Sequence, residues 1–127
     1  MSSHASTVTL RLPARPTAAA QARHAVRDTC RHLSEGTVSD ATLLVSELVT
    51  NAVRYAGGII TVVIDCEPDR VAIAVGDDSP AQPIVCDPHP SETHGRGMRL
   101  VDSVAAQWGC RPTSEGEGKT VWFSLPA

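Results

Sequence analysis

The chain has 127 residues, of which 42% are apolar, enough for a single domain (residues 1–127) that folds around its own core without disulfide or metal staples. A net charge of −3 argues against a general nucleic-acid-binding protein, which needs a basic surface to displace phosphate counterions. No apolar run reaches the roughly 18 residues that a membrane-spanning helix needs. The four scattered cysteines form no C-x-x-C pair and predict free thiols in a reducing, cytoplasmic setting.

Hydrophobic periodicity predicts a strand, two helices, a strand hairpin, a third helix and a closing pair of strands. In chain order their expected ranges are Thr7–Leu12, Pro16–Ser34, Thr37 or Ser39 to about Ala56, Ile59–Cys66, Arg70–Asp77, Met98–Ala106, Gln107–Arg111 and Lys119–Leu125. Residues 1–27, with four arginines and no acid, also resemble a transit peptide, although the same stretch fits folded structure. Ser79–His94 contains four prolines and no periodicity, and so long a loop in a small domain is usually functional.

The order of these elements predicts an α+β fold. Glu67-Pro68-Asp69 separates two β-rich runs and predicts a hairpin between them. Strands joined in this way pair antiparallel, and helices that follow the first strand must bury their apolar stripe against the sheet. We therefore expect a two-layer α/β sandwich, with a mixed, mostly antiparallel sheet covered by about three helices on one face.

The second expected helix carries the most informative polar residues. Glu47, Asn51 and Arg54 stand at i, i+4 and i+7, so they share one face of the helix. A carboxylate and an amide oxygen one turn apart can hold a hard cation such as Mg²⁺, which prefers oxygen ligands shared with phosphates. The alternative is an ordinary solvated face of an amphipathic helix.

Three short motifs have both a functional and a structural interpretation. Gly95-Arg96-Gly97 opens the third expected helix, whose free N–H groups suit a phosphate, although glycines before helices are common. Asp77-Asp78 ends a strand, where adjacent acids most often form a turn. Gly118-Lys119-Thr120 looks like the end of a P-loop, but Thr113 stands where the first glycine belongs and a strand pattern follows, which excludes that motif.

The loop Ser79–His94 holds the remaining candidates. A polar, proline-stiffened loop explains its composition better than a metal site does. The side chains weighed as metal ligands are Cys86, Asp87, His89 and His94. Ser79 has no His and Asp partners in its sequence context, so a hydrolase triad is unsupported.

Four segments in order resemble the motifs of the GHKL (histidine kinase-like) ATPase superfamily. Residues 46–56 (SELVTNAVRYA) resemble its N-box, residues 75–79 (VGDDS) its first glycine box, residues 95–101 (GRGMRLV) its second glycine box, and residues 118–123 (GKTVWF) its closing strand motif. The order and spacing match from about residue 7 to residue 125. The sequences of these motifs are nearest to those of small stand-alone regulators similar to anti-sigma-factor serine/threonine kinases. The resemblance implies the Bergerat fold of that superfamily.

The resemblance also implies a role for each matched position. Glu47 would be the general base that takes the proton from a partner's hydroxyl, and Asn51 would coordinate the Mg²⁺ that bridges the ATP phosphates. Asp77 would accept a hydrogen bond from the adenine amine, with Thr120 near both. The loop Ser79–His94 would be the ATP lid. The other positions implied in nucleotide binding are Arg54, Tyr55, Gly95, Arg96, Gly97 and Met98.

Three functions remain open at this point. The first is a kinase that phosphorylates an anti-sigma-factor antagonist and holds a sigma factor. The second is a non-catalytic module whose partner affinity is set by ATP. It is motivated by the sequence Asp78-Ser79-Pro80-Ala81, which follows Asp77 in place of the usual D-x-G-x-G pattern. The third is a degenerate fold that serves as a dimerisation scaffold. Relatives commonly pair as homodimers, but nothing in the chain fixes a dimer face, and neither nucleic acid nor membrane is an expected partner.

Overall fold

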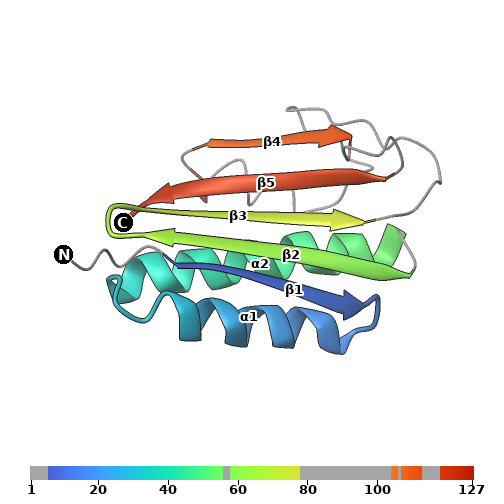
Figure 1. The fold of residues 1–127 in the computed structure, drawn as a ribbon, viewed down its shortest axis with the longest axis horizontal. Helices are drawn as coiled ribbons and strands as arrows, with labels where there is room; N and C mark the ends of the chain where they lie inside the picture. The colour runs from blue at the N-terminus through green and yellow to red at the C-terminus, as the bar shows by residue number, and fades with distance from the viewer. Residues whose placement is uncertain (1–5, 56–57, 78–103, 106, 113–117) are drawn as a thin grey trace.

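The computed structural model describes residues 6–55, 58–77, 104–105, 107–112 and 118–127 (Figure 1). The elements are β1 (Ser6–Pro13), α1 (Thr17–Thr29), α2 (Glu35–Tyr55), β2 (Ile59–Glu67), β3 (Arg70–Asp77), β4 (Gln107–Pro112) and β5 (Lys119–Pro126). Every predicted strand is present, with ends that differ by at most one residue. The third expected helix, Met98–Ala106, lies almost entirely outside the described residues. Neither α1 nor α2 has the length and apolar character that crossing a lipid bilayer demands.

The five strands form one sheet in the order β1-β2-β3-β5-β4, and each neighbouring pair is antiparallel. Both described helices pack on the same face of this sheet, while the other face is turned to the viewer in Figure 1. This arrangement confirms the α+β, two-layer prediction, with pairing that is antiparallel throughout the described strands rather than mixed. β3 and β5 become neighbours although residues 78–118 lie between them in sequence.

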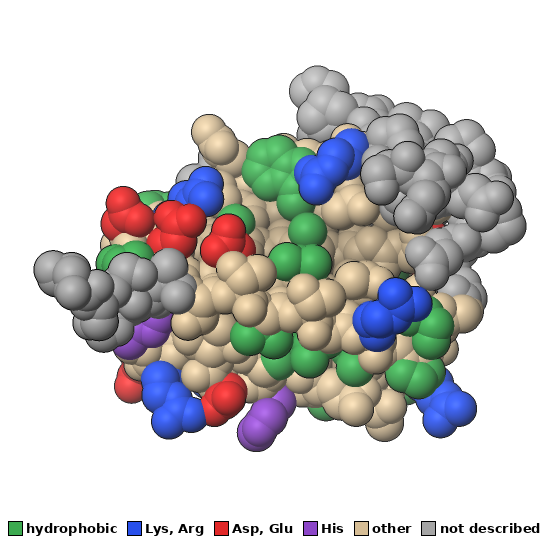
Figure 2. All heavy atoms as spheres, viewed as in Figure 1, with side chains coloured by type: hydrophobic (Ala, Val, Ile, Leu, Met, Phe, Trp, Pro, Cys, Tyr) green, Lys and Arg blue, Asp and Glu red, His purple; other side chains and the backbone are tan. Residues whose placement is uncertain are grey.

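The core lies between the sheet and the helices and is mostly aliphatic. Side chains of β2 and β3 alternate between buried and partly buried, as expected when one face of a sheet is covered. The largest fully buried side chains include Phe123, Leu44, Ile60, Ile64 and Ile73. Figure 2 looks onto the uncovered face, where acidic side chains gather near the turn between β2 and β3. Burial of the covered face thereby sets which side chains of each strand can line a site between the layers.

The boundary between the two helices differs from the prediction. The first helix ends at Thr29 rather than at Ser34, and the second begins at Glu35, before the caps expected at Thr37 or Ser39. Ser34 is the N-cap, because its Oγ accepts a hydrogen bond from the Thr37 N–H at 3.2 Å and donates one to Thr37 Oγ1 at 2.9 Å. The earlier serine therefore starts α2, and Thr37 becomes its capping partner inside the first turn.

Candidate functional site

The second half of α2 carries the polar stripe that the sequence predicts. Val49 and Ala52 are buried on the core side of the helix, whereas Glu47 and Asn51 are partly buried. Their four-residue spacing places the carboxylate and the amide one turn apart on one face. Arg54 is exposed in the last turn. The stripe therefore runs from partly covered side chains at Glu47 and Asn51 to an exposed one at Arg54.

Asp77 ends β3 as a buried carboxylate. Its side chain is 5% exposed, and its Oδ2 lies 3.2 Å from Nζ of Lys119, whose side chain is 20% exposed. Removing a carboxylate from water costs several kcal/mol unless a partner compensates its charge. Lys119 supplies that partner because β5 pairs with β3, with Thr120 opposite Gly76. A covered acceptor and a partly exposed donor therefore meet where β3 ends and β5 begins.

The backbone at position 118 lies so close to the backbone of Asp77 that only a glycine fits there. Gly118 has a φ of +81°, a conformation that other L-residues rarely adopt. A Cβ at this position would lie 2.0 Å from the carbonyl oxygen of Asp77. The pair Gly118-Lys119, which looked like part of a P-loop, thus has a structural explanation: the glycine permits the close approach and the lysine compensates the carboxylate.

Lys119, rather than Thr120, occupies the position against Asp77. Successive side chains of a strand point to opposite faces of the sheet. Thr120 lies opposite Gly76, and a Cβ on that glycine would lie 3.1 Å from Thr120 Oγ1. Thr120 is therefore on the uncovered face, while Asp77 shares the covered face with Val75. Thr120 thus lies beside Gly76, the neighbour of Asp77 along the strand, and its expected place near the adenine stays a prediction.

The C-terminal half of α2 and the end of β3 lie at the same end of the molecule (Figure 1). The fold thus brings Asn51 and Asp77, which come from different layers, to one end of the helix–sheet interface. Tyr55 is the last residue of α2, and its side chain lies outside what the structure describes. The predicted site residues Gly95, Arg96, Gly97 and Met98 also lie outside the described residues.

A polar contact beside the stripe was missed by sequence reasoning. The guanidinium Nη1 of Arg23 on α1 donates a partly buried hydrogen bond to Ser46 Oγ on α2, with a donor–acceptor distance of 2.9 Å. Ser46 immediately precedes Glu47, so the bond ties α1 to the turn of α2 that carries the proposed base. Spacing along the chain gives no signal for it, because the bond depends on how the two helices pack.

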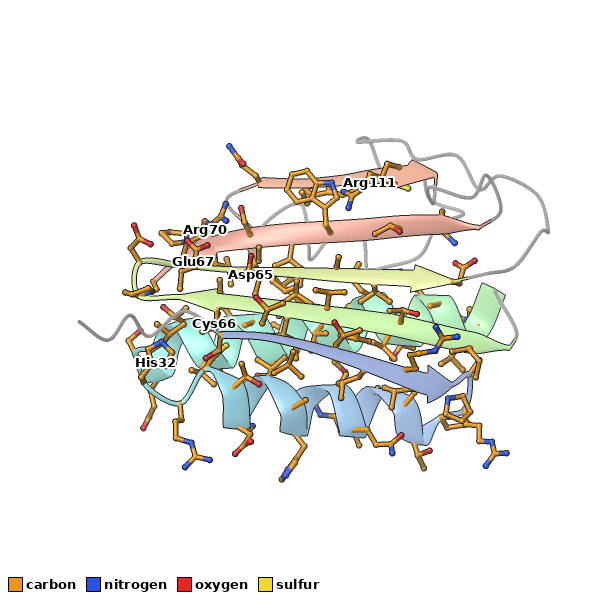
Figure 3. All side chains as sticks on the ribbon, in the orientation of Figure 1. His32, Asp65, Cys66, Glu67, Arg70 and Arg111 are labelled. Carbon is orange, nitrogen blue, oxygen red and sulfur yellow. The ribbon has the colours of Figure 1, made fainter. Side chains whose placement is uncertain are left out.

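A second group of titratable side chains lies at the opposite end of the sheet, where Figure 3 labels His32 and Cys66. Cys30 and Cys66 are fully buried free thiols. Cys66 Sγ lies 3.9 Å from His32 Nε2. Burial raises the pKa of both thiols, so they stay neutral in the folded protein. These thiols belong to the core rather than to the site at Asp77.

The state of the cysteines matches the prediction only in part. Cys30 and Cys66 are free thiols, as expected, whereas Cys110 on β4 is disulfide-bonded. The sequence does not reveal this bond because the fold, and not the spacing along the chain, decides which cysteines meet. Within the described ranges, no group of three or more His, Cys, Asp or Glu side chains could hold a metal ion.

Comparison with known proteins connects nearly the whole chain to one family. The family model described as histidine kinase-like ATPase domain matches residues 12–125. The matched range includes both helices, the polar stripe on α2 and the Asp77–Lys119 pair. No curated protein matches the chain.

Proposed function

The chain belongs to the histidine kinase-like ATPase family, within the GHKL superfamily, and from this membership we propose that it is a serine/threonine protein kinase that phosphorylates an anti-sigma-factor antagonist with Mg-ATP. Domains of this family bind ATP, and an ATP-binding regulatory function is what the membership itself supports. The kinase reaction, the antagonist and the sigma factor that the protein would hold are the additions made by the proposal.

The observation that carries the proposal is the partly buried pair of Glu47 and Asn51 on one face of α2. A general base needs a carboxylate that is shielded enough to hold one position and open enough to reach a substrate hydroxyl. Glu47 would take the proton from the serine or threonine hydroxyl of the antagonist as that oxygen attacks the terminal phosphate of ATP. The hydrogen bond between Arg23 and Ser46 supports this role, because it anchors the turn that carries Glu47.

The chemistry of the described residues fits a magnesium-bound adenine nucleotide. Asp77 offers a buried acceptor for an amino group, as base recognition requires. Asn51 offers an amide oxygen, and magnesium that arrives with phosphates needs only one or two protein ligands. Bound magnesium would neutralise charge on the phosphates. Arg54, three residues after Asn51 on the same face, adds a cation beside that amide.

A nucleotide-gated binding module is the second candidate. In this function ATP would set the affinity for a protein partner, and no phosphate would be transferred. The motivating observation is the sequence Asp77-Asp78-Ser79-Pro80-Ala81, which lacks the glycines of the usual first glycine box. The same nucleotide-binding residues would serve both functions, so the two functions differ in what Glu47 does and not in how the nucleotide binds.

The proposed partners are proteins in either case. A sigma factor or its antagonist would be the regulatory partner, and a second copy of the chain would form a homodimer. We place the protein in the cytoplasm, where ATP is available. That expectation rested on four free thiols, and the disulfide bond of Cys110 departs from it.

Two substitutions separate nucleotide binding from catalysis. Asp77→Asn removes a charged acceptor and should weaken Mg-ADP binding about tenfold or more. Glu47→Ala should leave that binding within about twofold and slow phosphate transfer by roughly 10²-fold or more, because it removes only the base. Asp40→Asn, at an exposed position early in α2, is the matched control and should change neither. Calorimetric titration with Mg-ADP measures binding, and labelled ATP with the antagonist measures transfer.

The outcomes distinguish the candidate functions. If the wild-type protein binds both Mg-ADP and the antagonist but transfers no phosphate, the kinase proposal fails and the gated module stands. If Mg-ADP produces neither heat nor a thermal shift, both candidates fail and a dimerisation scaffold is favoured. Thermal unfolding of each variant shows whether a loss of binding reflects a loss of folded protein.

A further inference from the structure

The contact between Asp77 and Lys119 presents an acceptor and a donor side by side. The carboxylate is nearly covered at 5% exposure, while the ammonium that bonds to it at 3.2 Å is 20% exposed. A lysine ammonium carries three donor hydrogens, and the carboxylate uses one of them. Lys119 can therefore compensate Asp77 and still donate to a ligand. It is also the only lysine in the chain.

Local structure fixes the ammonium at this position. Gly118 lies against the backbone of Asp77, and the pairing of β5 with β3 directs the next side chain to the covered face. The sheet and α2 enclose that face, and Asn51 lies on α2 at the same end of the molecule (Figure 1). If Asp77 binds one polar atom of a base, the adjacent atom of that base would thus face the ammonium group of Lys119.

The adenine edge carries the complementary pattern. Its N6 amino group is a donor, and the adjacent ring nitrogen N1 is an acceptor. Guanine presents a carbonyl oxygen and an N1–H at the same places, so it mismatches an acceptor–donor pair at both atoms. A site that pairs both polar atoms of a base rejects the wrong base more strongly than one that reads a single atom, because a mismatch leaves buried polar groups unpaired.

We propose that Lys119 is a base-reading residue that donates a hydrogen bond to N1 of adenine while Asp77 accepts one from the N6 amine. This inference rests on the proposed nucleotide binding and adds a specificity-determining residue to that site. It differs from a purely electrostatic role, in which Lys119 only compensates the charge of Asp77 and does not contact the base.

Nucleotide analogues that change a single atom test the inference. 1-Deaza-ADP replaces N1 with a C–H group, and purine riboside diphosphate lacks the N6 amine. The wild-type protein should bind Mg-1-deaza-ADP about tenfold more weakly than Mg-ADP, the expected loss for one hydrogen bond from a charged donor. Lys119→Met should bind the two nucleotides within about twofold of each other, because the donor is gone. Calorimetric titration gives each dissociation constant.

Two further variants control for indirect effects. Lys119→Arg keeps a charged donor and should keep a preference for ADP over the 1-deaza analogue. Arg111→Met removes an exposed cation of β4, which pairs with β5 at Thr120 and lies away from Asp77, and should keep the wild-type preference. A merely structural role of Lys119 would lower all affinities together and would leave the ratio between the two nucleotides unchanged.

Equal affinity of the wild-type protein for ADP and 1-deaza-ADP overturns the inference, and this comparison needs no variant. A wild-type ratio that persists in Lys119→Met also overturns it. If purine riboside diphosphate binds weakly while 1-deaza-ADP binds normally, Asp77 reads the base alone and the proposed nucleotide binding stands. If none of the nucleotides binds, the proposed function and the inference fail together.

Discussion

Gly118 is the residue whose replacement tests the geometry around Asp77 most directly. Any side chain is costly at this position, because φ is positive and an added Cβ would lie 2.0 Å from the carbonyl oxygen of Asp77. We expect Gly118→Ala to lower the free energy of unfolding by about 2 kcal/mol or more, measured by urea denaturation. Gly36→Ala is the control, since its Cβ meets nothing within 4 Å and it lies in a helix, where alanine should stabilise by up to about 1 kcal/mol. Equal stabilities of the two variants would contradict the contact.

Among the individual site residues, some can be predicted from the sequence and others cannot. Glu47 and Asn51 were predicted to share a helix face, because a four-residue spacing is a property of the helix itself. Lys119 was set aside with the P-loop motif, although it is the residue that reaches Asp77. Its partner depends on how β5 aligns with β3, and a shift of one residue would place Thr120 there instead.

Among the elements, α2 depends on a cap that the sequence alone left ambiguous. The sequence offered Thr37 or Ser39 as the cap and assigned Ser34 to the end of the preceding helix, whereas the hydrogen bonds identify Ser34 as the cap. α2 carries both the core side chains and the polar stripe, so its first turn affects how well the site is held. The structure therefore places the start of this element several residues before the predicted one.

Replacing the cap tests its contribution to stability. Ser34→Ala should lower the free energy of unfolding by about 1 kcal/mol, because the Thr37 N–H loses its acceptor. Ser39→Ala, at an exposed position inside α2, should be neutral or slightly stabilising, since alanine has the higher helix propensity. Urea denaturation of both variants gives the comparison. A larger loss for Ser39→Ala than for Ser34→Ala would show that the cap lies elsewhere.

For the whole molecule, the pH dependence of stability reports on the buried thiols. Burial raises the pKa of Cys30 and Cys66 in the folded protein, whereas unfolded thiols titrate near about 8.5. Above that pH the unfolded chain binds fewer protons than the folded one, so stability falls as pH rises toward the folded pKa values. The contribution is fully present below pH of about 8.5 and declines by up to about 1.4 kcal/mol per pH unit and thiol above it.

The matching experiment compares the wild-type protein with the double variant Cys30→Ala, Cys66→Ala. Urea denaturation at about pH 7 and about pH 10 should show a steeper loss of stability for the wild-type protein, because only it has the raised thiol pKa values. Subtracting the pH dependence of the variant's free energy of unfolding from that of the wild-type protein removes the contribution of all other groups. Parallel slopes would mean that the two thiols titrate in the folded state as they do in the unfolded chain.

The sequence by itself determined the elements, the α+β class and the polar stripe of α2, because periodicity, turns and helix spacing are local properties of the chain. Only the tertiary structure decided the strand order β1-β2-β3-β5-β4 and the pairing of β3 with β5. Burial of Phe123 and its aliphatic neighbours fixes that register, since a slip of one residue would turn them to the uncovered face. The register in turn brings Lys119 to Asp77, a contact between distant segments that no local pattern encodes.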